Sequence, residues 1–301
     1  MFLAETLAIG SATCIALSAL LFGELRGRVA LFRLVRWQML AALAMTGTVS
    51  LALGGWRDVA PWQFGLLAAS SLSAVVVGST CYFAAIFAAG PRNTALLFSL
   101  TAPFALVLGY FFLGETIGPR QGIGVALVLL GIVLAIGMPK AEPGGEASLR
   151  AWHQTLSAGI AFGTVTAFCQ ALGNLLARPA MAAGVEPFTA MALRSAVAAA
   201  VFVAIALVAR VLPFPALKRP HRFAWRDLGI AAGASFIGAG LGMSLLMAAL
   251  ARGQVGIVST LASMTPVMIL PLAWLRTGTA PPPRAWIGAA LAVLGTGAIG
   301  L

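Results

Sequence analysis

Long apolar stretches separated by short polar breaks fill the chain from end to end. A helix that crosses a bilayer needs about 20 apolar residues, each adding about 1.5 Å. By that measure the pattern predicts about ten membrane-spanning helices, which cover residues 3–22, 34–53, 62–87, 94–113, 121–138, 154–177, 187–208, 228–250, 255–275 and 285–301. We therefore predict an all-α membrane protein.

One stretch of this pattern occurs twice, over residues 90–137 and 253–300. Each copy has an opening glycine, a proline within an apolar helix and two later glycines, which are Gly90, Pro103, Gly124 and Gly131 in the first copy and Gly253, Pro266, Gly288 and Gly295 in the second. The prolines are 163 residues apart, and both pairs of later glycines are 164 residues apart. Two copies of an apolar unit in a membrane chain indicate a transporter built from repeats.

The repeats divide the chain into residues 1–138 and 154–301, joined at 139–153 by a charged, Pro/Gly-rich linker. Residues 14–21 (CIALSALL) and 169–176 (CQALGNLL) extend the match to the first helix of each half. Five spans per half is an odd number, so the second half must cross the bilayer in the opposite sense. The sequence thus predicts two inverted five-helix repeats.

Composition and charge support this picture. Sixty per cent of the residues are hydrophobic and nine per cent are charged, against roughly 25% charged residues in soluble domains. The net charge of +11 comes from basic residues in the breaks, which is typical of loops that set membrane orientation and not of nucleic-acid binding. The odd-numbered connections carry most of them, so we expect a multi-pass protein of the bacterial inner membrane with both termini outside.

Several pieces of the sequence resemble a known superfamily. The span that contains Pro103 is followed by an FFLGE break at 111–115 and then by the glycine-rich helix GVALVLLGIVL at 124–134. This order of motifs looks like the drug/metabolite transporter superfamily, and within it the EamA-type exporters. The resemblance implies a ten-helix carrier with a central cavity lined by spans one to four and six to nine. It also implies small-metabolite or drug substrates, and an amino-acid exporter, including one for aromatic amino acids, fits this group.

Two positions depart from that pattern. Gly278 stands in the second half where the first half has Glu115, and Gln170 stands where the family often has an aromatic residue. Many relatives also keep both termini in the cytoplasm, in contrast to the orientation that the charges predict here.

Polar residues on the sixth span are the first candidate site. Thr166, Gln170 and Asn174 recur at steps of four and so share one helix face. Unpaired polar groups are costly in hydrocarbon, so these side chains either line a wet cavity or bond to a neighbouring helix.

Spans four and nine supply further candidates around their prolines. Phe98 and Thr101 precede Pro103, and Ser259, Ser263 and Thr265 precede Pro266. A mid-span proline removes one backbone hydrogen bond and frees a carbonyl. We therefore predict a hinge and a substrate contact at both places, the alternative being a static kink. Tyr82 and Phe98 are the candidates for stacking a flat substrate.

Arg36 and Arg194 stand near the start of the second span of each half. An arginine near a span end can extend its charged head to the interface at little cost, which is the interpretation we favour for both. The alternative is that one of them binds a substrate carboxylate through a bidentate pair.

Acidic residues are absent from the middle of every predicted span, which disfavours exchange of cationic drugs for protons. The sequence has no P-loop and no nucleophile–base set, and its three cysteines show no metal-ligand spacing. We expect no enzyme activity, catalytic residue, metal or cofactor. The predicted function is a secondary transporter that exports small polar or zwitterionic metabolites, foremost amino acids, as a monomer or homodimer. A cationic drug/proton antiporter and a non-transport scaffold are the alternatives.

Overall fold

The structure, a computed structural model, describes residues 2–26, 28–113, 118–136, 145–211, 224–252, 258, 261–262 and 264–300. The described part of the first half contains α1 (Phe2–Gly23), α2 (Leu31–Leu53), the 3₁₀ helix η1 (Gly55–Asp58), α3 (Pro61–Ser70), the π-helix η2 (Ser71–Val77), α4 (Gly78–Phe98), α5 (Thr101–Leu113) and α6 (Pro119–Ile136). The second half contains α7 (Gly145–Ala182), α8 (Pro187–Val211), α9 (Trp225–Ser235), the π-helix η4 (Phe236–Gly242), α10 (Met243–Arg252), α12 (Thr265–Thr277) and α13 (Pro283–Gly300).

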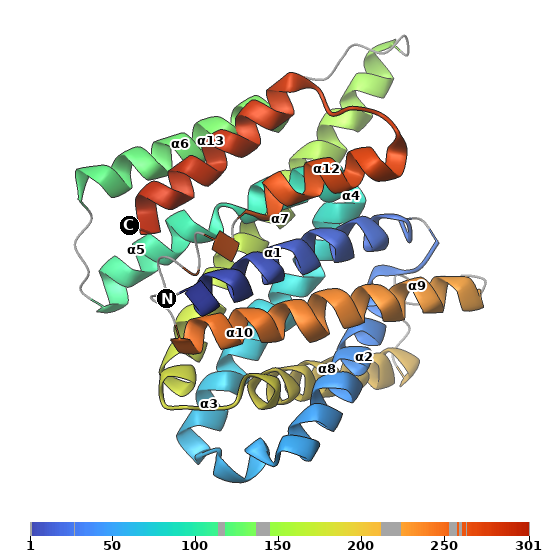
Figure 1. Cartoon of the computed structure of the whole chain (residues 1–301). Coiled ribbons are helices and arrows are strands. Elements are labelled where there is room, and N and C mark those ends of the chain that lie inside the picture. The colour runs from blue at the N-terminus through green and yellow to red at the C-terminus, as the bar shows by residue number, and fades with distance from the viewer. Residues whose placement is uncertain are drawn as a thin grey trace.

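The predicted all-α membrane architecture is confirmed. Five helical stretches are individually long and apolar enough to cross a membrane, and four shorter apolar helices accompany them. Large apolar side chains such as Phe111, Val133 and Leu275 are exposed on the outside of the bundle, where lipid is the solvent. The start of α1 and the end of α13 lie at the same face of the bundle (Figure 1), as an even number of crossings requires.

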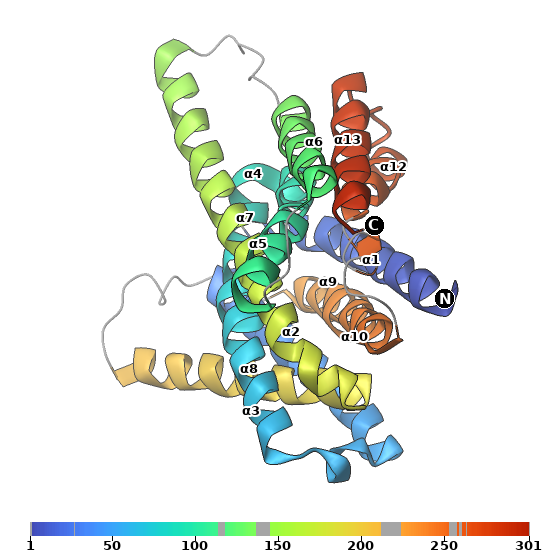
Figure 2. The same ribbon diagram turned by 90° about the vertical axis from the view of Figure 1, so that its left-hand side faces the viewer.

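The pair α6 and α13 shows how the two repeats are related. These helices lie side by side at one edge of the bundle (Figures 1 and 2). A Cβ added at Gly131 would lie 2.5 Å from the carbonyl oxygen of Gly288, and one at Gly295 would lie 2.5 Å from that of Gly124. The 164-residue repeat exchanges these two contacts. Such a reciprocal contact is the signature of a two-fold relation, and its antiparallel direction confirms the inverted repeat.

A second pair of contacts follows the same relation. The Ser18 hydroxyl on α1 donates to the carbonyl oxygen of Ala234 at 2.8 Å, and the Ser70 hydroxyl on α3 donates to the carbonyl oxygen of Gly173 at 2.7 Å. Residues 18 and 173 are equivalent in the matched first helices, and Ser70 and Ala234 lie one and two residues before the π-helical segments η2 and η4 of the third helices. The first helix of each half therefore packs against the third helix of the other half.

The third span of each half carries a π-helical segment that the sequence analysis did not anticipate. The segment η2 interrupts the third span between α3 and α4, and η4 interrupts the eighth between α9 and α10. The two segments are 165 residues apart and equally long. Single π-helical turns are rare and are often found at functional sites, so their occurrence at matching places marks this level of the bundle.

The predicted turn into the fourth span is centred on Gly90. Its φ of 84° lies in the left-handed region that favours glycine, and helical structure resumes at Pro91. The prediction of one continuous helix over 94–113 with proline at its centre is wrong, because the helix ends at Phe98 and a new one starts at Thr101.

The break has a clear physical cause. Pro103 has no N–H to donate to the carbonyl of Ser99, and the N–H groups of Ser99 and Leu100 donate to carbonyl oxygens only three residues back, each at 3.0 Å. Pro103 and Pro266 both lie in the first turn of a helix, α5 and α12 respectively. A missing N–H leaves no helical hydrogen bond unmade there.

The helix that contains the sixth span, α7, starts at Gly145, inside the predicted linker. Its apolar stretch that is long enough to cross a membrane begins at Thr155, as predicted.

Two ion pairs connect elements at the face opposite the termini. The guanidinium of Arg28 lies 3.8 Å from the carboxylate of Asp227 at the start of α9, and Arg276 at the end of α12 pairs with Glu24.

The reciprocal glycine contact predicts a specific sensitivity. In Gly131→Ala the new methyl group meets backbone atoms of α13 that cannot move aside as a side chain would. We expect the free energy of unfolding to fall by about 1–3 kcal/mol, the usual cost of overpacking, as measured by denaturation in detergent. Gly122→Ala on the same helix is the control, since a Cβ at Gly122 meets nothing within 4 Å. Equal stability of the two variants would contradict the close contact.

Candidate functional site

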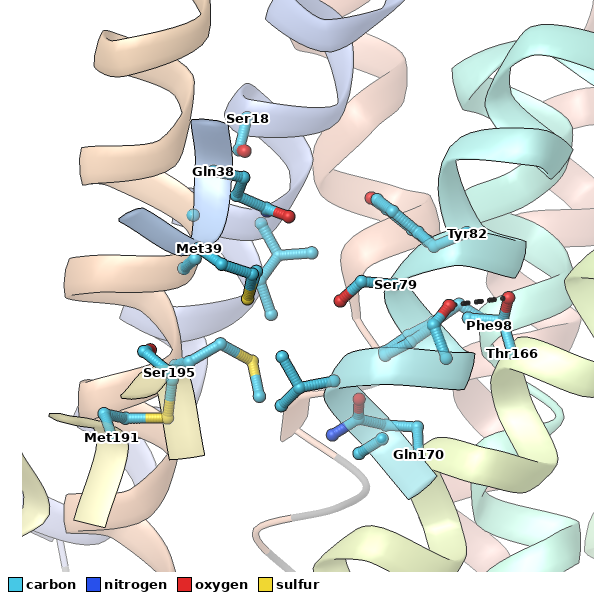
Figure 3. A pocket seen from close by; sticks show the side chains of 17 residues that line it. Ser18, Gln38, Met39, Ser79, Tyr82, Phe98, Thr166, Gln170, Met191 and Ser195 are labelled. Carbon is cyan, nitrogen blue, oxygen red and sulfur yellow. Dashed lines mark hydrogen bonds between the residues drawn. The ribbon is translucent and has the colours of Figure 1, made fainter. Parts of the chain in front are cut away.

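A cavity lies between the two halves and draws its walls from both. The first half contributes α1, α2, η2 and α4, and the second contributes α7, α8, η4 and α10 (Figure 3). The lining residues are Ile15, Ser18, Gln38, Met39, Ala74, Val75, Gly78, Ser79, Tyr82, Phe98, Thr166, Gln170, Met191, Ser195, Gly238, Ala239 and Met243. The predicted outer helices, α6 and α13, contribute no described residue to this wall.

The cavity is small and neutral. Its volume is about 80 Å³, well below the roughly 300–1,000 Å³ of pockets that bind drug-sized ligands. None of the described lining residues has a carboxyl, ammonium, guanidinium or imidazole group; the polar groups are hydroxyls and amides. Among the described residues, no group of three or more His, Cys, Asp or Glu side chains is placed to hold a metal ion.

Two polar atoms in the wall have no hydrogen-bond partner within the described part of the chain. These are Oε1 of Gln38 and Oγ of Ser195, on side chains that are 8% and 1% exposed. Buried polar atoms are almost always satisfied, so each exception needs an explanation. Figure 3 shows Gln38 and Ser195 at opposite ends of the same wall, with the cavity beside them.

The structure brings four predicted site residues together in the cavity wall: Tyr82, Phe98, Thr166 and Gln170. The rings of Tyr82 and Phe98 meet edge to face with centroids 6.2 Å apart. The Thr166 hydroxyl lies 2.8 Å from the carbonyl oxygen of Phe162 on its own helix and 3.3 Å from the carbonyl oxygen of Gly78 on α4, and it can donate to either.

Asn174 lies behind Gln170, outside the wall. The Gln170 amide Nε2 donates to Oδ1 of Asn174 at 3.0 Å. Thr166 and Gln170 of the polar stripe on α7 line the cavity, and of these two Thr166 also bonds to a neighbouring helix, through the carbonyl of Gly78. Gln170 faces the cavity, and Asn174 fixes the orientation of its amide.

Two predicted contact residues have local partners instead. The Thr101 hydroxyl donates to the carbonyl of Phe98 at 2.6 Å, and the Thr265 hydroxyl donates to that of Ala262 at 3.0 Å. Both bonds bind the last turn before a helix break, and they are equivalent in the two repeats. Neither threonine lines the cavity. Ser259 and Ser263 lie outside the described residues, so their substrate contact stays a prediction.

The two arginines do not behave alike. Arg36 on α2 is half-buried and Arg194 on α8 is fully buried, at 0% exposed. The interpretation that Arg194 extends to the interface is therefore wrong. The reason is that α8 packs against α2, η2 and α10, so the side chain is enclosed between helices before it can reach a membrane surface.

Sequence reasoning missed much of the opposite wall, including Gln38, Met39, Met191 and Ser195. One signal was available for Gln38, because Gln38, Thr46 and Ser50 stand at multiples of four on α2 and are all buried. That is the same periodicity that pointed to α7. Nothing in the sequence marked the methionines, which look like ordinary core residues.

Two inverted five-helix repeats that enclose a cavity at their interface define a membrane transporter. A model of the EamA-like transporter family matches residues 2–137 and 157–301, one match for each repeat. The chain belongs to the EamA-like transporter family.

Two further comparisons agree with this. The chain is 35% identical over 75 residues to a protein from Bacillus subtilis (strain 168) named uncharacterized transporter YwfM. That match covers 23% of this chain, and it spans only about a quarter of the relative's length. A solved crystal structure has the same fold, with a TM-score of 0.68 over 98% of this chain and 94% of the other, at 20% sequence identity.

The position of Gln170 leads to a direct test. In Gln170→Leu the cavity keeps its size but loses an amide group. We expect the affinity for a polar transported solute to fall about two- to tenfold, corresponding to one hydrogen bond of roughly 0.5–1.5 kcal/mol. The measurement is the half-saturation concentration for transport in reconstituted vesicles. Thr101→Val, which removes a hydroxyl outside the wall, is the control, and equal affinity in both variants would contradict a substrate contact at Gln170.

Proposed function

We propose that this transporter exports a small polar or zwitterionic metabolite, foremost an amino acid, across the bacterial inner membrane. The observation that carries the proposal is the neutral cavity with the unpartnered Gln38 Oε1 and Ser195 Oγ in its wall. Leaving a buried polar atom unsatisfied costs free energy. A polar solute that bonds to these atoms removes that cost, whereas an apolar drug does not.

The size of the cavity favours a small solute. Its volume of about 80 Å³ is smaller than the roughly 300–1,000 Å³ of pockets for drug-sized ligands. A metabolite as small as an amino acid suits it better than a drug. The aromatic pair Tyr82 and Phe98 offers a flat apolar surface for a side chain, and the amides of Gln38 and Gln170 offer donors and acceptors for the polar end.

The alternative of a cationic drug/proton antiporter finds less support. Such exchange needs a carboxylate that binds the cation and the proton in turn, and no described residue of the cavity wall is acidic. A non-transport scaffold would not need a polar cavity at the interface of its repeats.

Alternating access follows from the inverted repeats. Exchanging the conformations of two halves that are related by a two-fold axis moves the opening from one face to the other. The helix breaks before α5 and α12 are equivalent in the two halves and provide the places where this exchange can bend the chain. In this proposal Pro103 and Pro266 act by keeping the breaks open.

The hinge role predicts a separation of transport from folding. In Pro103→Ala an N–H becomes available to the carbonyl of Ser99, so a continuous helix from residue 91 to 113 can form. We expect the transport rate to fall severalfold while thermal stability in detergent stays the same or rises. Pro266→Ala should behave alike. Wild-type transport rates in both variants would remove the hinge from the mechanism.

The substrate class is tested with purified protein in proteoliposomes. We expect counterflow of labelled amino acids from a panel of alanine, serine, leucine and phenylalanine, with no requirement for a pH gradient during exchange. The lipophilic cation tetraphenylphosphonium serves as the rival substrate. If it accumulates in vesicles with an acidic interior, driven by the outward flow of protons, while no amino acid exchanges, the antiporter is the right assignment and the amino-acid proposal is wrong.

A further inference from the structure

Arg194 is a buried cation without a counter-ion in the described structure. Its side chain is 0% exposed. Nη1 lies 3.7 Å from the sulfur atoms of Met191 and Met247, which are weak acceptors. Neither of the two ion pairs among the described residues includes it. A buried charge is normally paired, and an intramembrane ionisable residue is a functional-site hypothesis by default.

The unused part of the guanidinium has a specific shape. Nε and Nη2 have no hydrogen-bond partner among the described residues. These two nitrogens lie on one edge of the planar group, and their N–H bonds point the same way. Parallel N–H bonds of this kind match the two oxygens of a carboxylate, which arginine binds in a bidentate manner.

Arg194 lies directly behind the cavity wall. Met191, one helical turn before it, and Ser195, the residue after it, both line the cavity. The sulfur of Met191 contacts the guanidinium, so a single side chain separates the charge from the cavity. Methionine is unbranched and adapts its conformation readily. Figure 3 shows Met191 and Ser195 together at one end of the cavity, away from Gln38.

We propose that Arg194 is the anion-binding residue of the transport site and that it selects solutes with a carboxylate. The Met191 side chain moves away from Nη1 and the guanidinium turns its Nε–Nη2 edge toward the cavity. The carboxylate then accepts hydrogen bonds from Nε and Nη2, and it also accepts one from the unpartnered Ser195 hydroxyl. An amino acid bound this way directs its ammonium group toward Oε1 of Gln38 at the other end. The inference rests on the proposed function, since it assigns the carboxyl end of the exported solute.

The first test needs no variant. For the amino acid of the panel that exchanges fastest, counterflow is compared with that of its carboxamide, the matching amine without the carboxyl group, and the matching acid without the amine. For leucine these are leucinamide, 3-methylbutylamine and 4-methylpentanoate. We expect the amide and the amine to compete at least tenfold more weakly than the amino acid, and the amine-free acid to remain a competitor.

The second test replaces the arginine. Arg194→Met removes the buried charge and fills its place with an apolar side chain of similar length, and such a replacement is often neutral or stabilising for the fold. We expect the melting temperature in detergent to be unchanged or higher, and binding of the amino acid to weaken tenfold or more. Arg194→Lys keeps the charge without the planar fork and should recover only part of the binding. Arg178→Met, at an exposed position of α7, is the matched control.

The outcomes separate the two proposals. The role of Arg194 is overturned, and amino-acid export is left in place, by either of two results. One is that the carboxamide competes as strongly as the amino acid itself, and the other is that binding is unchanged in a folded Arg194→Met protein. Absence of amino-acid exchange in the wild type overturns the export proposal. In that case Arg194-dependent binding of 4-methylpentanoate supports carboxylate selection, and its absence overturns it. If Arg194→Met does not fold, the wild-type competition and Arg194→Lys decide.

Discussion

The glycines of α6 and α13 bring two helix backbones close together, with Gly131 against Gly288 and Gly295 against Gly124. Lipid tails are as apolar as leucine, so helices in a membrane gain little from hiding apolar surface and associate instead through close packing of small residues. The repeat exchanges the two contacts, so the two-fold axis that relates the halves passes between them. The same two-fold relation governs the packing of α1 and of α7, each against the third helix of the other half, and the matching helix breaks.

The cavity inherits the symmetry of the backbone but not of the side chains. The π-helical segments η2 and η4 enter it from opposite halves with Ala74 and Ala239 at equivalent places. The polar side chains, in contrast, are not repeated at equivalent places of the wall: Gln38 and Tyr82 come from one half, and Gln170 and Ser195 come from the other. A symmetric frame therefore holds an asymmetric site, which a solute with two chemically different ends requires.

Periodicity and the internal repeat sufficed to predict the ten spans, their inversion and part of the wall, because hydrocarbon imposes length and polarity rules on every helix. Gln170 and Tyr82 were found because polar or aromatic groups inside a span are conspicuous. The break at Ser99–Leu100 was placed too late, since a proline marks the residue that cannot donate, whereas the helix is interrupted one turn before it. The fate of Arg194 could not be predicted, because burial between α8 and α10 is decided by packing across the chain and not by distance from a span end.

The ion pairs Arg28–Asp227 and Arg276–Glu24 occur at one face of the bundle, and residues at corresponding places in the other repeat, such as Trp62 and Pro179, are uncharged. In the proposed alternating-access cycle, opening that face separates these two ion pairs, and the described residues at the equivalent places of the other repeat have no such pairs to separate. On that proposal the two end states differ in energy even though their backbones are related by exchange. Salt screens such pairs, so a higher ionic strength on that side would shorten the time that the carrier spends with that face closed.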